Sequence, residues 1–236
     1  MVYKWLNNVQ NWLLPPACLV CGQASHNPLS ICPECHKDLN YIDYACPRCA
    51  IPMPFSGQHT LCGRCQQKAP AFDQTLSLFH FETPIRQLIH GMKFNKRLSH
   101  AELLGNLLAT TIQQQHEALP QALVPVPLTK TRLRHRGFNQ ALELAKPVSR
   151  QLHIPIFRNQ VIRKGKGPAQ SSLDLKQRRR NVRGSFLVKP GQWPEHVAIV
   201  DDVMTSGSTC HELARSLKKQ GVRQVTVWCI ARASLQ

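Results

Sequence analysis

The hydrophobic pattern of the chain changes near residue 72, where short apolar runs begin to alternate with segments of helical periodicity. The strand-like runs occupy residues 75–81, 122–128, 196–200 and 224–231. The helical segments occupy residues 84–94, 101–115, 138–152 and 207–220, and the third is expected to be disrupted near Pro147. Apolar strands alternating with amphipathic helices predict an α/β fold, with a mostly parallel sheet and helices on its faces. Ligands of such sheets bind at the carboxyl ends of the strands.

The first 16 residues carry a separate amphipathic pattern. Its apolar residues share helical spacing and are Trp5, Leu6, Val9, Trp12 and Leu13. Two prolines, Pro15 and Pro16, end the pattern, so we predict a short helix over residues 1–16. Packing against the body of the protein is the default role, and base stacking or contact with a membrane surface are the alternatives.

Residues 17–70 contain eight of the ten cysteines of the chain, in four pairs of identical spacing. The pairs are Cys18 with Cys21, Cys32 with Cys35, Cys46 with Cys49, and Cys62 with Cys65. Two thiolates separated by two residues in a tight turn point at one ion, and two such pairs complete a tetrahedral shell for zinc. Four pairs therefore predict a double zinc ribbon with two structural zinc ions, which would stabilise a segment that has few large apolar residues. Pairing of consecutive turns is preferred over an arrangement that pairs the first with the third and the second with the fourth.

The chain has neither a signal-peptide pattern nor a run of about 18 to 20 apolar residues, the length that a membrane span needs. We therefore expect a cytoplasmic protein in a reducing compartment, which argues against disulfides between these cysteines. The expected domains are an amphipathic helix over 1–16, a double zinc ribbon over 17–70 and an α/β domain over 71–236.

The most specific motif is VAIVDDVMTSGST, residues 197–209. A buried strand is expected to deliver Asp201 and Asp202 to a turn, after which a loop of small hydroxyl residues around Gly207 leads into a helix. The loop N–H groups, the hydroxyls and the positive end of the helix suit a phosphate. Adjacent carboxylates would repel a phosphate, but they suit the vicinal hydroxyls of a sugar, with a divalent cation nearby. Phosphate and diol together indicate a ribose 5-phosphate. The alternative is a turn with a polar helix cap.

These thirteen residues resemble the phosphoribosyl pyrophosphate motif of type I phosphoribosyltransferases. That resemblance implies that Asp201 and Asp202 contact the ribose hydroxyls. It also implies that the 5-phosphate is bound by the loop residues Thr205, Ser206, Gly207, Ser208 and Thr209. Residues 123–140, residues 168–186 and the terminal strand ending at Arg232, preceded by the four cysteine pairs, are similar to the ComF family, which includes GntX-like DNA-utilisation proteins.

The ComF resemblance implies a phosphoribosyltransferase-like sheet, a role in DNA uptake or use of external DNA, and magnesium bound together with phosphoribosyl pyrophosphate. Single-stranded DNA and a helicase or uptake protein are the implied macromolecular partners. The charge agrees with an anionic partner, because 30 Lys and Arg face 13 Asp and Glu and give a formal net charge of +17. Residues 71–236 hold 25 of the basic and 10 of the acidic residues.

Two basic segments are candidates for anion contacts. The first follows the strand that would carry the pyrophosphate loop, which comprises Pro127, Leu128, Thr129 and Lys130. The second corresponds to the mobile loop of the related enzymes, where basic residues would neutralise pyrophosphate or follow a nucleic-acid backbone. The flexible-loop or nucleic-acid residues of both segments are Arg132, Arg134, Arg136, Arg163, Lys164, Lys166, Arg178, Arg179, Arg180 and Arg183. A solvated charge run is the alternative.

Two features of the sequence bear on catalysis. Some nucleobase-specific relatives carry a carboxylate at the position of Thr205, and threonine cannot act as that acid or base. A glutaminase activity is not expected, because Cys18 belongs to a cysteine pair. Three hypotheses follow: a nucleic-acid-handling protein that binds phosphoribosyl pyrophosphate, a phosphoribosyltransferase with an unidentified acceptor, and an adaptor that docks a partner through its zinc ribbons.

Overall fold

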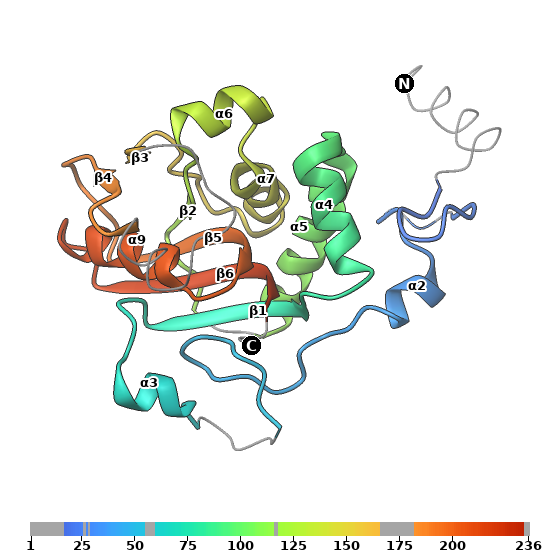
Figure 1. Ribbon diagram of the computed structural model, residues 1–236, viewed down its shortest axis with the longest axis horizontal. Helices are drawn as coiled ribbons and strands as arrows, with labels where there is room; N and C mark the ends of the chain where they lie inside the picture. Colours follow the sequence, from blue (N-terminus) through green and yellow to red (C-terminus); the bar gives the residue numbers. More distant parts are fainter. Residues whose placement is uncertain are drawn as a thin grey trace.

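The computed structural model describes residues 17–25, 27, 29–54, 60–115, 118–165 and 182–233. The predicted N-terminal helix over 1–16 lies outside these residues. The described chain forms an α/β domain with the cysteine-rich segment along one side of it (Figure 1).

The α/β domain is built on a sheet of four strands. They are β1 (Gln74–His80), β2 (Ala122–Pro125), β5 (His196–Met204) and β6 (Gln224–Arg232). Their order is β1-β6-β5-β2, and every neighbouring pair is parallel. The two central strands β5 and β6 are almost entirely apolar along their buried parts, as expected for strands covered on both faces. The predicted strands over 75–81, 196–200 and 224–231 are thus confirmed, and the strand predicted over 122–128 ends at Pro125.

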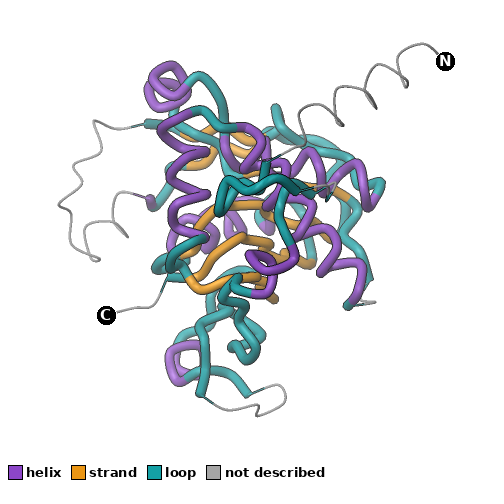
Figure 2. Tube along the Cα trace, turned by 90° about the vertical axis from the view of Figure 1, so that its right-hand side faces the viewer, coloured by secondary structure: helices purple, strands orange, loops and turns teal. Residues whose placement is uncertain are grey.

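Helices cover both faces of the sheet (Figure 2). Ala198 and Val200 of β5 point into the core formed with α4 (Ile85–Asn95), α5 (Leu98–Gln114) and α7 (Gln140–Leu152). Val197 and Ile199 point into the opposite core, which α9 (Ser208–Lys218) covers. The alternation of side chains along a strand assigns consecutive residues to opposite cores. The predicted fold class, a parallel sheet flanked by helices, is confirmed.

The expectation that Pro147 disrupts the helix over 138–152 is wrong. Helix α7 continues through Pro147 to Leu152. The proline ring packs so closely on α5 that a Cβ added at Gly105 would lie 2.3 Å from its Cγ. Packing of α7 on α5 therefore compensates for the hydrogen bond that Pro147 cannot donate.

The sequence pattern did not predict two other elements. Residues after β2 form α6 (Lys130–Arg136), which is capped by the Thr129 hydroxyl accepting from the Arg132 N–H at 3.3 Å. Two short strands, β3 (Val161–Arg163) and β4 (Phe186–Val188), pair as an antiparallel ribbon. The ribbon packs against the core on the α9 side through Phe186 and Val188.

The cysteine-rich segment contains two short helices, α2 (Pro33–Lys37) and α3 (Gly63–Gln67). Each begins directly after a cysteine, Cys32 and Cys62 respectively, so the second thiolate pair of each site is presented by a helix N-terminus.

In the part of the chain that the structure describes, no helix combines the length and the hydropathy that crossing a membrane requires.

Candidate functional site

The sequence predicted that Asp201 and Asp202 lie in a turn after the strand, but both residues lie within β5. Asp201 pairs with Cys229 and Met204 with Arg232 of β6, so the strand continues to Met204. On its other side β5 loses its partner earlier, because β2 ends at Pro125 opposite Val200. The two carboxylates therefore stand on a rigid strand at the edge where ligands of parallel sheets bind.

Asp201 points to the α9 face of the sheet. Its Oδ2 lies 3.9 Å from the thiol of Cys210, and its Oδ1 accepts a hydrogen bond of 2.9 Å from the Asp202 N–H. Burial, followed by the charge of Asp202, raises the pKa of Asp201 to about 7, although the Asp202 N–H and the charges of Lys93 and Arg163 act in the opposite direction. Burial also raises the pKa of the Cys210 thiol, which stays protonated. Asp201 is therefore poised between its neutral and ionised forms.

Asp202 points to the opposite face and is paired. Its Oδ2 lies 3.0 Å from Nζ of Lys93, which α4 contributes. Burial lowers the pKa of Arg136 on α6, and the charge of Asp202 opposes that shift, so Arg136 also faces this carboxylate. Asp202 thus stands in a cationic environment. Nothing in the amino-acid pattern singles out Lys93, since its helix shows only an ordinary amphipathic pattern.

The hydroxyl-rich loop has the local geometry expected of an anion site. Gly207 adopts a φ of 73°, a left-handed conformation that glycine tolerates best, and α9 begins at the next residue. The N-cap residue Gly207 has no side chain to cap the helix, and no acidic residue lies in the first turn of α9. The Ser206 and Ser208 hydroxyls are 2.7 Å apart, and the Ser208 N–H donates to the Ser206 hydroxyl at 3.3 Å. The helix terminus and the hydroxyls can therefore serve an incoming phosphate.

The predicted pyrophosphate-loop residues lie between β2 and α6. Pro127, Leu128 and Thr129 form a loop at the carboxyl end of β2, and Lys130 is the first residue of α6. Gly165, which follows β3, packs over this loop so tightly that a Cβ there would lie 3.3 Å from the Thr129 side chain. The loop and the end of β3 therefore lie side by side next to the strand that carries the acids.

Helix α6 makes the edge of the site basic. Its seven residues include five that are Lys, Arg or His and no acid. Among the described residues, no carboxylate lies within ion-pair distance of Lys130, Arg132 or Arg134.

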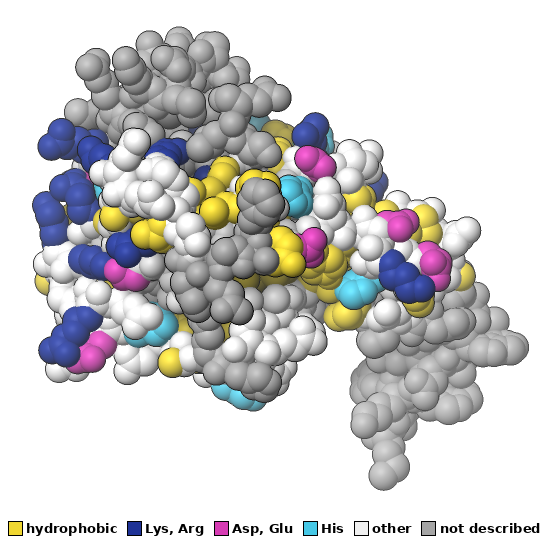
Figure 3. Space-filling view, turned by 90° about the horizontal axis from the view of Figure 1, so that it is seen from below, with side chains coloured by type: hydrophobic (Ala, Val, Ile, Leu, Met, Phe, Trp, Pro, Cys, Tyr) yellow, Lys and Arg dark blue, Asp and Glu magenta, His cyan; other side chains and the backbone are white. Residues whose placement is uncertain are grey.

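A second basic region is visible from below, where Lys and Arg side chains gather at the end of the molecule that carries α9 (Figure 3).

The flexible-loop residues fall into two groups. Arg163 and Lys164 lie at the end of β3, and Arg163 is near enough to Asp201 to influence its pKa. Arg183 lies close to α9, in the wall of a cleft. Lys166, Arg178, Arg179 and Arg180 lie outside the described residues.

The eight cysteines form two clusters with the consecutive pairing that the sequence favoured. One cluster joins Cys18, Cys21, Cys32 and Cys35, the other joins Cys46, Cys49, Cys62 and Cys65, and within each the sulfur atoms lie within 4.8 Å of one another. The Cys21–Cys32 and Cys49–Cys62 sulfur distances are 3.9 and 3.7 Å. Thiolates in a tetrahedral zinc shell are about 3.8 Å apart, whereas a disulfide requires about 2.05 Å.

Backbone donors support the same interpretation of the cysteine clusters. The Cys35 N–H donates to the Cys32 sulfur and the Cys62 N–H to the Cys46 sulfur, each at 3.4 Å. Such bonds stabilise thiolates that bind a metal. The residues therefore fit two structural zinc ions in closed four-thiolate shells, which leave no position for a substrate.

These observations define the class of the protein: a parallel α/β domain with an acidic and hydroxyl-rich strand end, joined to a double zinc ribbon. The family description "Double zinc ribbon domain" matches residues 9–70. DNA utilization protein YhgH of Escherichia coli strain K12 is 34% identical over 228 residues, which cover 93% of this chain and 98% of that protein. Competence protein F of Haemophilus influenzae is 35% identical over 210 residues, or 86% and 90% of the two chains.

The chain therefore belongs to the ComF family, the family of competence protein F and DNA utilization protein YhgH. Among solved structures, a purine phosphoribosyltransferase from Pyrococcus horikoshii is 18% identical, with a TM-score of 0.35 over 56% of this chain and 73% of that one. An adenine phosphoribosyltransferase from Thermoanaerobacter pseudethanolicus is 14% identical, with a TM-score of 0.35 over 58% and 82%. At these TM-scores the family assignment rests on the sequence relatives alone.

Proposed function

We propose that this protein acts in DNA uptake or in the use of external DNA and that it binds phosphoribosyl pyrophosphate with magnesium at the end of β5. The observation that carries the ligand is the placement of Asp201, Asp202 and the 205–209 loop at one strand end, directly before the α9 N-terminus. Carboxylates accept hydrogen bonds from a ribose diol, and the loop with its helix terminus binds the 5-phosphate. The Thr129 and Lys130 loop beside them suits the pyrophosphate, whose charge magnesium would offset.

A glycine comparison tests the ligand. Gly207→Ala puts a side chain at a φ of 73° within the loop, whereas Gly221→Ala does so at a φ of 97°, where nothing lies within 4 Å of the new Cβ. Each strains the backbone by roughly 1 kcal/mol. Calorimetry with phosphoribosyl pyrophosphate and magnesium is expected to show weaker binding for Gly207→Ala and unchanged binding for Gly221→Ala. Absence of binding by the unaltered protein would contradict the proposal.

Single-stranded DNA is the proposed second ligand, and the surface between α4 and α6 supports it. Phe94 is 62% exposed, its ring centroid is 4.4 Å from that of His90, and the Arg136 guanidinium lies 5.6 Å from it. Arg136 belongs to the basic helix α6, which follows the pyrophosphate-loop residues. Exposed aromatic rings stack on bases while neighbouring cations contact phosphates, without a need for a particular sequence.

Fluorescence anisotropy with labelled oligo-dT tests the DNA ligand. Phe94→Ala and Arg134→Gln are expected to weaken binding about tenfold each, and Arg134→Gln also flattens the salt dependence. Tyr44→Ala is the matched control for an exposed aromatic residue, since Tyr44 is 52% exposed on the ribbon segment. Arg223→Gln is the control for an exposed arginine, since Arg223 pairs with Glu195 before the amino end of β6. Equal losses in the controls would contradict this surface as the DNA site.

Transfer of the phosphoribosyl group is the second candidate function. The strand end offers groups that would hold a leaving pyrophosphate, but Thr205 supplies no acid or base. Release of pyrophosphate from phosphoribosyl pyrophosphate and magnesium, measured with and without single-stranded DNA, distinguishes an enzyme from a ligand-binding protein. Docking of a helicase or an uptake partner through the zinc ribbons is the third candidate and is compatible with either.

A further inference from the structure

The second cysteine cluster, which comprises Cys46, Cys49, Cys62 and Cys65, is connected to the phosphate loop over residues 205–209 by two arginine side chains. Its turn over residues 46–49 lies beside the sheet, where the Thr75 N–H donates to the Pro47 carbonyl at 3.0 Å. The Thr75 hydroxyl donates to the carbonyl of Arg48 at 2.8 Å. The backbone of this turn is therefore fixed to the first residues of β1.

Arg232 connects the same turn to the loop. It is the last residue of β6 and only 2% exposed. Its Nε donates to the Cys49 carbonyl at 2.9 Å, and its Nη1 donates to the Met204 carbonyl at 2.9 Å and to the Thr205 carbonyl. Within the described chain no carboxylate lies within ion-pair distance of this guanidinium. A buried charge must be hydrogen-bonded, so these carbonyls are what make its burial tolerable.

Arg64 makes a second connection from the same cluster. It lies on α3 between Cys62 and Cys65, and its Nη2 donates to the Ser206 carbonyl at 3.2 Å. A cleft of about 830 Å³ separates the cluster from α9, and its walls include Cys62, Ser206, Gly207 and Arg232. The two arginines therefore bridge the ribbon and the loop beside this cleft.

The bonded carbonyls belong to three consecutive residues, Met204, Thr205 and Ser206. In a trans peptide the carbonyl of one residue and the N–H of the next point in opposite directions. Carbonyls held toward the ribbon thus turn the N–H groups of Thr205, Ser206 and Gly207 away from it. Those are the donors that a phosphate in this loop requires.

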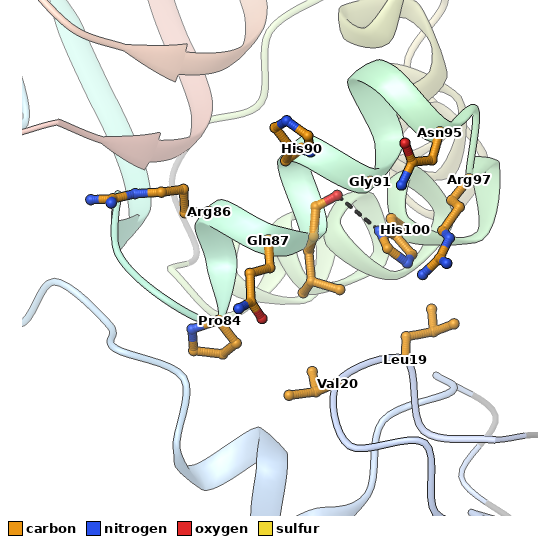
Figure 4. A pocket seen from close by; sticks show the side chains of 11 residues that line it. Leu19, Val20, Pro84, Arg86, Gln87, His90, Gly91, Asn95, Arg97 and His100 are labelled. Atoms are coloured by element: carbon orange, nitrogen blue, oxygen red, sulfur yellow. Dashed lines mark hydrogen bonds between the residues drawn. The ribbon is translucent and has the colours of Figure 1, made fainter.

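The first cluster approaches the α/β domain at a different place. Leu19 and Val20 of its first turn face α4 across a cavity of about 360 Å³, whose other walls include Pro84, Arg97 and His100 (Figure 4). Further along, the Ile42 N–H donates to the Leu78 carbonyl at 2.9 Å, and the ring centroids of Tyr41 and Phe79 are 4.6 Å apart. In the described parts of the chain, no hydrogen bond or ion pair joins this cluster to residues 204–209.

We propose that the second cysteine cluster, through the positioning residues Arg232 and Arg64, holds the phosphate loop in its anion-binding conformation, so that zinc at this cluster and anion binding at the loop favour each other. The first cluster has no such coupling. Coupling of this kind is reciprocal, because a loop ordered by an anion also holds the carbonyls that fix the arginines of the ribbon. The ligand named in this inference rests on the proposed function, whereas the coupling between ribbon and loop does not.

Amide hydrogen exchange of the zinc-loaded full-length chain tests the coupling without any ligand. Arg64→Ala is expected to speed exchange about three- to tenfold in peptides that cover residues 204–209, since one hydrogen bond from a charged group is lost. Arg64 is exposed, so this variant is expected to fold. Arg232→Met is expected to act more strongly. Arg86→Ala is the matched control, because Arg86 is also exposed and donates to the Phe81 carbonyl at 3.1 Å, away from the loop.

The cysteine sites give the second half of the test. Cys62→Ser is expected to speed exchange in residues 204–209, and Cys21→Ser is expected to leave it unchanged, while zinc content falls from two ions to about one in both. Titration with phosphoribosyl pyrophosphate and magnesium then reports affinity, which should fall in Cys62→Ser, Arg64→Ala and Arg232→Met but not in Cys21→Ser or Arg86→Ala. Unchanged loop exchange in both Cys62→Ser and Arg64→Ala would overturn the coupling. Loop exchange that responds as expected, in a protein that binds no phosphoribosyl pyrophosphate, would instead reject the proposed ligand and leave the coupling standing.

Discussion

Asp201 and Asp202 are neighbours in the chain, but their side chains lie on opposite faces of β5 and have different surroundings. On the face covered by α4, Asp202 forms an ion pair of 3.0 Å with Lys93. On the face covered by α9, Asp201 is half-buried beside the Cys210 thiol, and the pKa of its carboxyl is raised to about 7. The doubled acid of the sequence is thus one carboxylate in an ion pair with Lys93 and one whose pKa lies near neutral pH.

In the proposed site, this difference gives the two residues different parts in binding a sugar phosphate. In the proposed site, Asp202 would accept hydrogen bonds from ribose hydroxyls while Lys93 holds its carboxylate in place. At pH 7, Asp201 becomes fully ionised only when a ligand supplies donors or positive charge. We expect affinity to depend chiefly on Asp202 and its pH dependence chiefly on Asp201.

The largest expected effect is on affinity. Asp202→Asn should weaken binding of phosphoribosyl pyrophosphate by about 100-fold, and Asp201→Asn by about tenfold at pH 7, as hydrogen bonds from ligand hydroxyls to a charged acceptor are lost. Calorimetry of both variants checks this order, with the exposed Glu195→Gln as a control for removal of a carboxylate. Equal losses in the two variants would show that the two carboxylates do not differ in their contribution to affinity.

The next effect is on stability. Asp201 has a folded pKa of about 7 and an unfolded value near 3.8, so the folded state holds an extra proton between these values. Stability therefore falls as pH rises from about 4 to about 7 and stays level above that range. Asp201→Asn should remove the fall and stabilise the protein by about 2 to 4 kcal/mol at pH 8. Urea unfolding across pH measures this, and a variant no more stable than the parent at pH 8 would refute the raised pKa.

A smaller effect is the proton released on binding. Near pH 7 about half of the Asp201 carboxyls carry a proton, and a ligand that hydrogen-bonds to the ionised form should displace about half a proton per site. Calorimetry in buffers of different ionisation enthalpy measures this number. Asp201→Asn should reduce it toward zero and Asp202→Asn should not.

The smallest expected effect comes from Lys93. Its charge lowers the pKa of Asp201, so Lys93→Met should move the pH range of the stability change upward. Loss of the ion pair with Asp202 should also cost about 1 kcal/mol of stability. The same urea series detects both changes. A shift of the range toward lower pH would show that Lys93 does not act on Asp201 in this way.

Most of the scaffold could be predicted from local sequence. The buried strands, the consecutive pairing of the cysteines and the loop before α9 all rest on residues close together in the chain. The exceptions have physical reasons. Pro147 stays inside α7 because Gly105 on another helix admits its ring, and the basic run after β2 forms a helix because the Thr129 hydroxyl caps it.

The sequence pattern could not predict the contacts that shape the site. Arg64 and Ser206 are 142 residues apart, and Arg232 and Cys49 are 183 apart. No periodicity or spacing links such positions, and only the folded sheet brings a cysteine turn against the phosphate loop. The same holds for Lys93, whose role follows from where α4 lies beside Asp202.

The most direct test of the central claim is a titration of the zinc-loaded protein with phosphoribosyl pyrophosphate and magnesium, beside the double variant Asp201→Asn with Asp202→Asn. We expect saturable binding at one site per chain, lost in the double variant, with the zinc content and the fold of both proteins intact. Binding of equal strength in the double variant would contradict it, because the ribose would then not be held by the carboxylates at the end of β5.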